Sequence, residues 1–173
     1  MNILENRRSV RQFDLTKTID DKIIEEILKT SMQAPSARNQ QPWEFVVVKD
    51  KDTIARLSQV SKGTMVLTNA NCVIVVVSKP LDALSTPDMA SQDLSIVSTY
   101  IMLSALEHKL GTCYLGIHPR EDRIDAVNSI LEIPNDYNAF SMIAIGYPKN
   151  EIIKERKYDD NLVHYNKLGN KYE

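Results

Sequence analysis

Three arginines and a serine lie close together near the amino terminus, in the stretch Arg7-Arg8-Ser9-Val10-Arg11. A guanidinium is a planar fork of N–H donors that pairs bidentately with phosphate oxygens, and a serine hydroxyl supplies another donor. The cluster therefore indicates a local anion site, suited to a phosphomonoester. A charge run of this kind can also be a solvated face, and the residues alone leave both interpretations open.

A second polar cluster, Pro35-Ser36-Ala37-Arg38-Asn39-Gln40-Gln41-Pro42-Trp43, is bracketed by two prolines and rich in amide side chains. Each amide offers a donor and an acceptor together, which matches the edge of a planar heterocycle with alternating carbonyl and N–H groups. Pro42 and Trp43 can fix the loop beside a following strand. The alternative is a structural turn that places Trp43 in the core.

The histidines and cysteines give a weaker signal. His108, near the end of a predicted helix, and His118, before a proline, are better interpreted as structural or surface residues, and His164 in the tail could touch a partner subunit. Cys113 and His118 lack a third group to orient them, so we interpret Cys113 as a buried thiol. No spacing resembles a zinc site or a glycine-rich phosphate loop, and we assign no metal.

The elements that must position these clusters follow from the spacing of apolar residues. Steps of three and four predict an amphipathic helix over Ile19–Met32, which must end before Pro35. Asp20 or Asp21 is placed to cap its start. The unbroken apolar run Cys72–Val77 predicts a strand covered on both faces. We expect three further helices: one over 52–60, one that begins at Asp88 and ends with Gly111 as its C′ residue, and one over Arg120–Leu131. Further strands are expected at Glu44–Val48, Cys113–Ile117 and Phe140–Tyr147, and an exposed loop is expected at Leu81–Pro87.

Length and composition bound the class of protein. The chain has 173 residues, 43% hydrophobic and 25% charged, which is enough for one domain with a core that needs no disulfide or metal. With 21 Lys and Arg against 23 Asp and Glu, the net charge of −2 excludes the global basic field of nonspecific nucleic-acid binding. No secretion signal or apolar run of about 20 residues is present. We expect a soluble cytoplasmic protein that binds neither nucleic acid nor membrane.

The tail from Pro148 to Glu173 is polar, with scattered apolar residues and no sustained periodicity. It cannot fold by itself, because it has no apolar face to bury. Spaced apolar residues favour an arm that lies on a neighbouring subunit over a disordered segment.

Taken in order, the two polar clusters resemble the paired signatures of the nitroreductase family of flavin enzymes. The resemblance covers essentially the whole chain. It continues through Leu110-Gly111-Thr112, Tyr114-Leu115-Gly116, Ile133-Pro134, Ile145-Gly146-Tyr147-Pro148, Lys154-Glu155-Arg156 and Val163-His164-Tyr165-Asn166.

The resemblance implies an α+β, three-layer fold, with a central mixed, mainly antiparallel sheet flanked by helices. Residues 1–173 would form a single FMN-binding domain, with 148–173 as a C-terminal arm that extends onto the partner subunit. The resemblance further implies a homodimer with FMN at the subunit interface. NAD(P)H would be a transient co-substrate, and a nitroaromatic, a quinone or a related small electrophile would be reduced by a ping-pong mechanism.

The resemblance also assigns cofactor contacts, and it leaves the chemistry to the flavin rather than to a catalytic side chain. The first cluster would hold the FMN phosphate and ribityl chain, the second would approach the ring or ribityl, and the end of a strand would bring backbone near the flavin N5 edge. The chain is shorter than the better-known members, so only Lys79–Ser91 could serve as a lid. The residues assigned are Arg7, Arg8, Ser9 and Arg11; Pro35, Ser36, Asn39 and Gln41; Leu115 and Gly116; and Lys154 and Arg156 in the tail.

Two alternatives to an enzyme stay open. The protein could be a flavin-binding sensor or storage protein with little turnover, since the inserted region that covers the substrate channel of longer members is missing. It could also be a binding module without flavin that uses Arg7, Arg8 and Arg11 on another anion.

Overall fold

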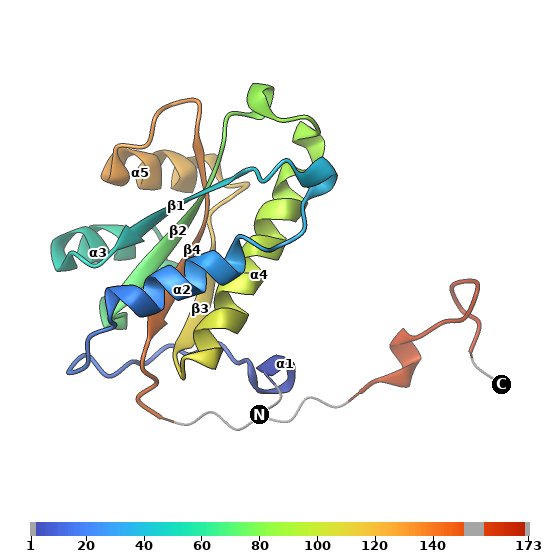
Figure 1. Ribbon diagram of the computed structural model, residues 1–173, viewed down its shortest axis with the longest axis horizontal. Helices are drawn as coiled ribbons and strands as arrows, with labels where there is room; N and C mark the ends of the chain where they lie inside the picture. The colour runs from blue at the N-terminus through green and yellow to red at the C-terminus, as the bar shows by residue number, and fades with distance from the viewer. Residues whose placement is uncertain (1–2, 151–157, 172–173) are drawn as a thin grey trace.

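The computed structural model describes residues 3–150 and 158–171 (Figure 1). Helices and strands alternate along most of the chain, and short 3-10 turns fill several connections. The helices are α1 (Ile3–Asn6), α2 (Asp21–Ser31), α3 (Lys51–Ser58), α4 (Ala90–Glu107) and α5 (Glu121–Leu131); the strands are β1 (Trp43–Val48), β2 (Cys72–Ser78), β3 (Gly111–Gly116) and β4 (Asn138–Gly146).

The four strands form one sheet in the order β1-β2-β4-β3, and every pairing between them is antiparallel. Parallel pairing enters only through an isolated bridge between Ser9 and Thr112 among the described residues. The strand β2 is central and buried along its whole length, as its unbroken apolar sequence predicts.

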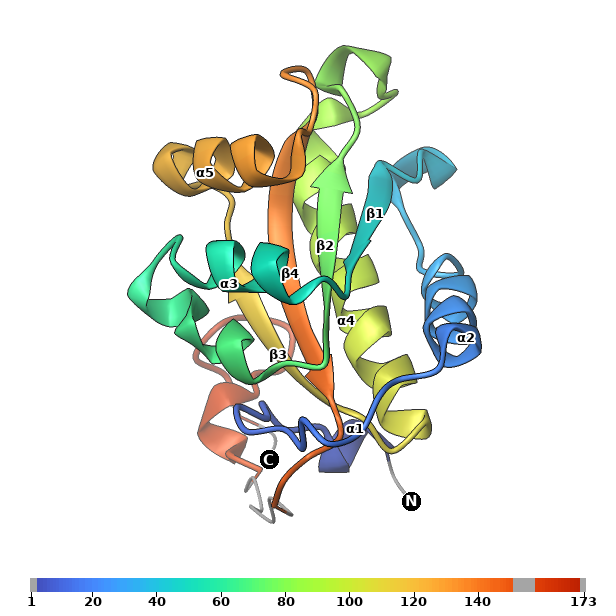
Figure 2. The ribbon, with the colours of Figure 1, turned by 90° about the vertical axis from the view of Figure 1, so that its left-hand side faces the viewer.

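Helices cover both faces of this sheet, which makes three layers (Figures 1 and 2). On one face, α2 and α4 pack their apolar side chains against alternate residues of β2 such as Ile74 and Val76. On the other face, α3 and α5 pack against Val73 and Val75. The α+β, three-layer fold expected from the sequence is therefore confirmed.

The amphipathic helix α2 begins at Asp20, whose side chain accepts a hydrogen bond from the Lys22 backbone N–H at 2.9 Å. We predict that Asp20→Ala lowers the free energy of unfolding by about 1 kcal/mol, because the first turn loses its cap. Asp20→Asn keeps an acceptor oxygen, so its free energy of unfolding should lie within a few tenths of a kcal/mol of the wild-type value. Chemical denaturation measures the free energy of unfolding of both variants, and an equal decrease in the two would contradict a capping role.

The prediction that Gly111 closes the long helix is wrong. The helix α4 ends at Glu107, and Lys109 takes the left-handed conformation with φ 61°. Gly111 is instead the first residue of β3. Glycine is required there for space, because a Cβ would lie 2.5 Å from Val10 Cγ2.

The sequence predictions missed several short elements, among them α1 and the 3-10 segment Lys62–Asn69, which contacts both α3 and β3. Their lengths of four and eight residues give too few turns for apolar periodicity to identify them. The exposed loop expected at Leu81–Pro87 contains two 3-10 turns, at Leu81–Ala83 and Pro87–Met89.

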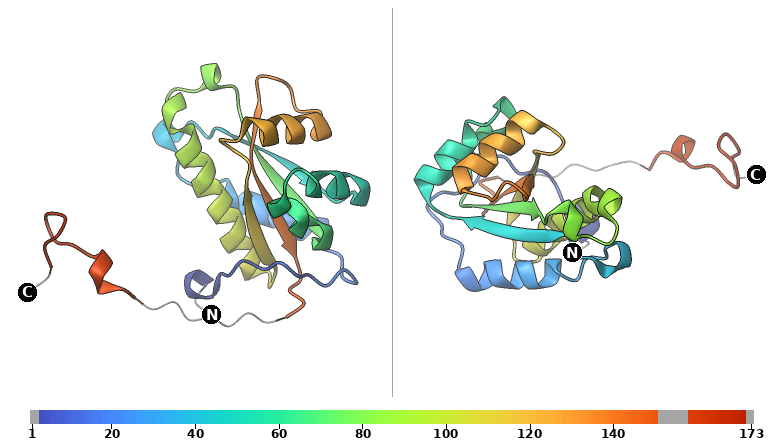
Figure 3. Two further views of the ribbon diagram at one scale, coloured as in Figure 1. Left: turned by 180° about the vertical axis from the view of Figure 1, so that it is seen from behind. Right: turned by 90° about the horizontal axis from the view of Figure 1, so that it is seen from above.

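The described part of the tail, 158–171, projects away from the three layers (Figures 1 and 3). Several hydrogen bonds join tail residues to one another, as where Lys171 Nζ donates to the carbonyls of Asp160 and Asn161. Leu162 and Leu168 are 78% and 90% exposed. Exposed leucines on an extended segment agree with an arm that is buried on a partner, which stays a prediction.

Candidate functional site

The arginine cluster lies on a segment that crosses the ends of β3 and β4. Ser9 bridges Thr112, the Val10 N–H donates to the Thr112 carbonyl at 2.8 Å, and Phe13 bridges Pro148. The side chains of Val10 and Phe13 are buried, so they anchor the segment on the sheet. The glycines at 111 and 146 leave room for these two side chains.

The arginine side chains project from this anchored backbone toward solvent. Arg7 and Arg8 are half-buried and Arg11 is exposed. Arg8 Nη1 donates to the carbonyls of Glu5, at 2.6 Å, and Arg7, at 2.9 Å, which holds its guanidinium beside α1. Arg7 and Arg11 form no ion pair with a carboxylate in the described ranges. The cluster thus keeps donors available for an anion.

The arginine cluster lies beside β3, because Ser9 and Val10 pair with Thr112. Burial raises the pKa of the Cys113 thiol, while the positive charges of Arg11 and Arg7 act in the opposite direction. The other cysteine, Cys72, lies in the core, and burial raises its pKa to about 12. Both thiols are free and buried, as expected for Cys113. Their burial agrees with a structural role for both thiols.

The second polar cluster forms a loop between α2 and β1, residues 35–42, which we call the amide loop. Its backbone is unusual. Arg38, Asn39 and Gln41 have φ values of 49°, 55° and 46°, in the left-handed region that non-glycine residues rarely adopt. The turn is closed by Ser36, whose carbonyl accepts from the Asn39 N–H and whose hydroxyl accepts from the Gln41 N–H, both at 3.0 Å. Such conformations cluster at ligand sites, where the surrounding structure holds them in place.

The amide side chains divide into two groups. Asn39 and Gln41 are exposed, as is Pro35, and they remain available to a ligand. Gln40 is half-buried and bonds to Thr86 and Asp93, so it is a structural member of the loop. Trp43 is buried in the core, which agrees with the structural part of the sequence interpretation.

The C-terminal end of β3 presents Leu115 and Gly116. Leu115 is half-buried, Gly116 is exposed, and a Cβ at Gly116 would meet only Tyr114 at 3.8 Å. The Gly116 carbonyl accepts from Arg123 Nη1 at 3.3 Å. The strand therefore ends in accessible backbone beside a cation, and the sequence analysis did not single out Arg123 because it lies on the following helix.

His118 lies just beyond this backbone. Its ring stacks on Phe140 with centroids 5.5 Å apart, and its Nε2 lies 3.3 Å from Ser91 Oγ. These contacts support the structural interpretation of His118. They also bring the end of β3 next to the first residues of α4.

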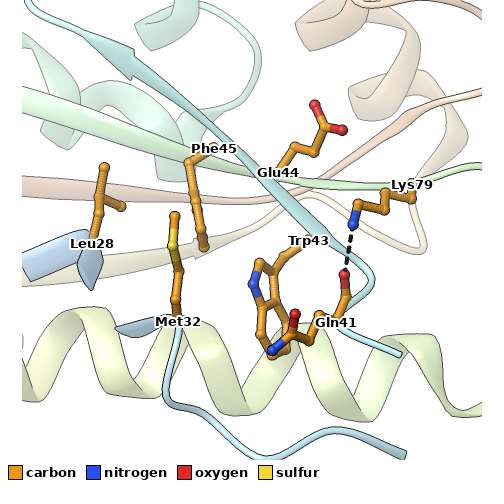
Figure 4. Close-up of a pocket in the computed structure, with 7 residues that line it drawn as sticks. All are labelled: Leu28, Met32, Gln41, Trp43, Glu44, Phe45 and Lys79. Atoms are coloured by element: carbon orange, nitrogen blue, oxygen red, sulfur yellow. Dashed lines mark hydrogen bonds between the residues drawn. The ribbon is translucent and has the colours of Figure 1, made fainter. Parts of the chain in front are cut away.

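A cavity of about 450 Å³ lies beside the amide loop, between α2 and β1 (Figure 4). Lys79 Nζ donates to the Gln41 carbonyl at 3.1 Å at its rim. No residue of the arginine cluster reaches it, so it is not the anion site. Its walls are Leu28, Met32, Trp43 and Phe45, with Gln41, Glu44 and Lys79 at the rim.

The structure does not bring the two clusters together within one chain. Ser9 pairs with Thr112, just beyond the C-terminal end of α4, whereas the Ala37 N–H donates to Asp93 in the first turn of α4. Asp93 lies 14 residues before the last residue of α4, Glu107. At 1.5 Å per residue, that stretch of helix is about 21 Å long.

The arginine cluster and the end of β3 are much closer. Four residues separate Thr112 from Gly116, which is about 13 Å in a strand. A single chain can thus offer one ligand both its anion site and the backbone of Leu115 and Gly116. Lys154 and Arg156, predicted to reach the phosphate, lie outside the described residues.

Comparison with known proteins decides the family. The model of the nitroreductase family matches residues 4–67 and 65–147, which is most of the chain. The chain belongs to the nitroreductase family. A relative from Archaeoglobus fulgidus, named as a candidate NADH dehydrogenase/NAD(P)H nitroreductase, is 38% identical over 151 residues, covering 87% of this chain and 86% of the relative.

Solved structures of family members share the fold over nearly the whole chain. A candidate NADH oxidase from Clostridium acetobutylicum has a TM-score of 0.89 at 34% identity, covering 96% of this chain and 99% of its own. An FMN-dependent nitroreductase from Clostridium difficile has a TM-score of 0.87 at 30% identity, covering 96% and 98%. Family membership assigns this chain to the NAD(P)H oxidoreductases. Within residues 3–150 and 158–171, no helix is long and apolar enough to cross a membrane.

Proposed function

We propose that the protein is an FMN-dependent, NAD(P)H-using oxidoreductase that works as a homodimer and reduces nitroaromatics, quinones or related small electrophiles. The observation that carries this proposal is the pair of donor sites at opposite ends of α4, on a chain of the nitroreductase family. One site suits a phosphate and the other suits the edge of a heterocycle.

The residues present fit FMN. The phosphate is a dianion, and Arg7 and Arg11 carry guanidiniums without a carboxylate partner in the described part of the chain. Bidentate pairing of guanidinium and phosphate is strong and oriented. Asn39 and Gln41 are exposed amides on a backbone fixed by Ser36, so they can read a flavin edge without first becoming ordered.

A dimer reconciles the distances. The arginine cluster and the end of β3 in one subunit would hold the phosphate and approach the ring, and the amide loop of the partner would complete the site. The exposed apolar residues of segment 158–171 support this pairing, because a second copy of the chain could bury them. Lys154 and Arg156 would add positive charge near the phosphate.

The chain's own residues then have distinct tasks. The arginines would hold the cofactor by its anionic end, and the amide side chains would donate hydrogen bonds to the ring edge, where they would stabilise the negative charge of the reduced form. Gly116 is exposed, so the backbone at the end of β3 would leave room for substrates beside the ring. Bound FMN supplies the hydride and electron transfer, so no side chain needs to act as nucleophile or general base.

Use of one face by both substrates predicts ping-pong kinetics. Initial rates with NADPH or NADH and a quinone should give parallel lines in double-reciprocal plots, because the nicotinamide leaves before the acceptor binds. Intersecting lines would contradict this scheme. If NAD(P)H fails to bleach the bound flavin under anaerobic conditions, the chain is a flavin-binding sensor or storage protein instead of an enzyme.

A further inference from the structure

A buried carboxylate anchors the amide loop. Asp93 is 3% exposed, in the first turn of α4. Its Oδ1 accepts from the Ala37 N–H at 2.9 Å, and its Oδ2 accepts from Gln40 Nε2 at 2.7 Å. Asp93 forms no ion pair in the described ranges. The start of α4 favours its negative charge, and the two donors offset its burial.

The Gln40 amide joins this carboxylate to a third segment. Its Nε2 also donates to the Thr86 carbonyl at 3.0 Å, and its Oε1 accepts from the Thr86 N–H at 2.9 Å and from the Thr86 hydroxyl at 3.0 Å. Turning the amide over would set oxygen against oxygen at Asp93, so the network fixes its orientation. Thr86 lies in the middle of Lys79–Ser91, which is therefore tied to the loop rather than free.

The hydrogen bonds of the Gln40 side chain restrain the backbone of the two residues next to it. Asn39 and Gln41 flank it in the chain, and both have positive φ. Positive φ is unfavourable at non-glycine residues, so the loop holds this shape only while other contacts impose it. Gln40 is fixed by four hydrogen bonds to Asp93 and Thr86.

We infer that Asp93 and Gln40 are positioning residues, which form a clamp with Thr86 that presents Asn39 and Gln41 to the flavin bound by the partner subunit. The inference rests on the proposed function, and it adds residues that touch neither cofactor nor substrate. It predicts that FMN affinity depends on the complementarity of donor and acceptor between positions 93 and 40.

An exchange of the two groups tests this complementarity. Asp93→Asn sets two N–H donors against each other, and Gln40→Glu sets two carboxylates against each other. In the double variant D93N/Q40E, the new amide at position 93 donates to the new carboxylate at position 40. The second oxygen at position 40 still accepts from Thr86, whereas the oxygen that replaces Nε2 loses its bond to the Thr86 carbonyl and faces that acceptor instead.

The dissociation constant of FMN is measured from the fluorescence released when the yellow protein is diluted. Each single variant should raise it by about tenfold or more, since a lost bond to a charged group is worth about tenfold. The double variant should bind FMN at least about threefold more tightly than either single variant, because the pairing between positions 93 and 40 is restored while the bond to the Thr86 carbonyl is not. Hydrogen exchange at the Ala37 amide should be faster in both single variants and slow again in the double variant. Asp52→Asn removes an exposed carboxylate from the first turn of α3 and should change neither readout.

The outcomes separate the two proposals. If the wild type binds no FMN, the proposed function fails and the clamp has no cofactor to position. If the wild type binds FMN but the double variant is as weak as the single variants, or the single variants bind like the wild type, the clamp alone is overturned. A single variant that does not fold leaves the double variant to decide, because restored folding and FMN affinity there require the pairing.

Discussion

Replacing Arg11 with alanine is expected to raise the dissociation constant of FMN by about tenfold to a hundredfold, since hydrogen bonds to charged groups contribute roughly 1.5–3 kcal/mol. Arg11 is exposed and bonds within the described chain only weakly, to the Ser9 carbonyl at 3.5 Å. Its removal should therefore leave the fold intact. Flavin released on dilution measures the affinity, and thermal unfolding of the FMN-free protein checks the fold.

Two further variants distinguish specific pairing from simple attraction of charge. Arg11→Lys keeps the positive charge without the planar fork and should fall between the wild type and Arg11→Ala. Arg56→Ala removes an exposed arginine from α3 and should bind FMN like the wild type. Equal affinity in all four proteins would show that the cluster is only a solvated face.

Gly146→Ala is expected to destabilise the protein by roughly 2–3 kcal/mol, because an added methyl overpacks a crowded site. The new Cβ would overlap Asn71 Oδ1 and lie 2.7 Å from Phe13 Cδ1. Asn71 cannot easily move, because its Nδ2 donates to the carbonyls of Asp14 and Lys17 at 2.9 and 2.7 Å. The melting temperature should fall by roughly 5–10 °C in a domain of this size.

This variant also tests the link between packing and the site. Phe13 anchors the segment that carries the arginines, so Gly146→Ala should weaken FMN binding as well as folding. Gly63→Ala is the matched control, because its Cβ would meet Ser61 Oγ at an ordinary 3.7 Å, and its stability should change by less than about 0.5 kcal/mol. A Gly146→Ala protein as stable as the control would show that Phe13 can shift.

Much of the fold could be predicted from local pattern. The helical spacing before Pro35 predicted α2, and the unbroken apolar run predicted β2, because these features depend on burial along one element. Gly111 was predicted wrongly because its requirement comes from Val10, a residue far away in the sequence. Contacts between distant segments leave no local signal.

The candidate site shows the same contrast between local signals and contacts of distant segments. The arginines and exposed amides could be singled out by type, because their chemistry is carried by the side chains themselves. Asp93 could not be, since an aspartate at the start of a helix is common and its role depends on the Ala37 N–H and Gln40. Nor does spacing in the sequence reveal that α4 holds the two clusters apart.

The central claim is that each flavin site takes its arginines from one subunit and its amide loop from the other. Mixed dimers test it most directly, with R7A/R11A in one differently tagged copy and N39A/Q41A in the other. Each variant homodimer should bind little FMN. The mixed dimer should hold one tightly bound FMN, because one of its two sites then has wild-type residues from both chains. A mixed dimer without tight FMN would contradict the claim, because it would mean that each site is built within a single chain.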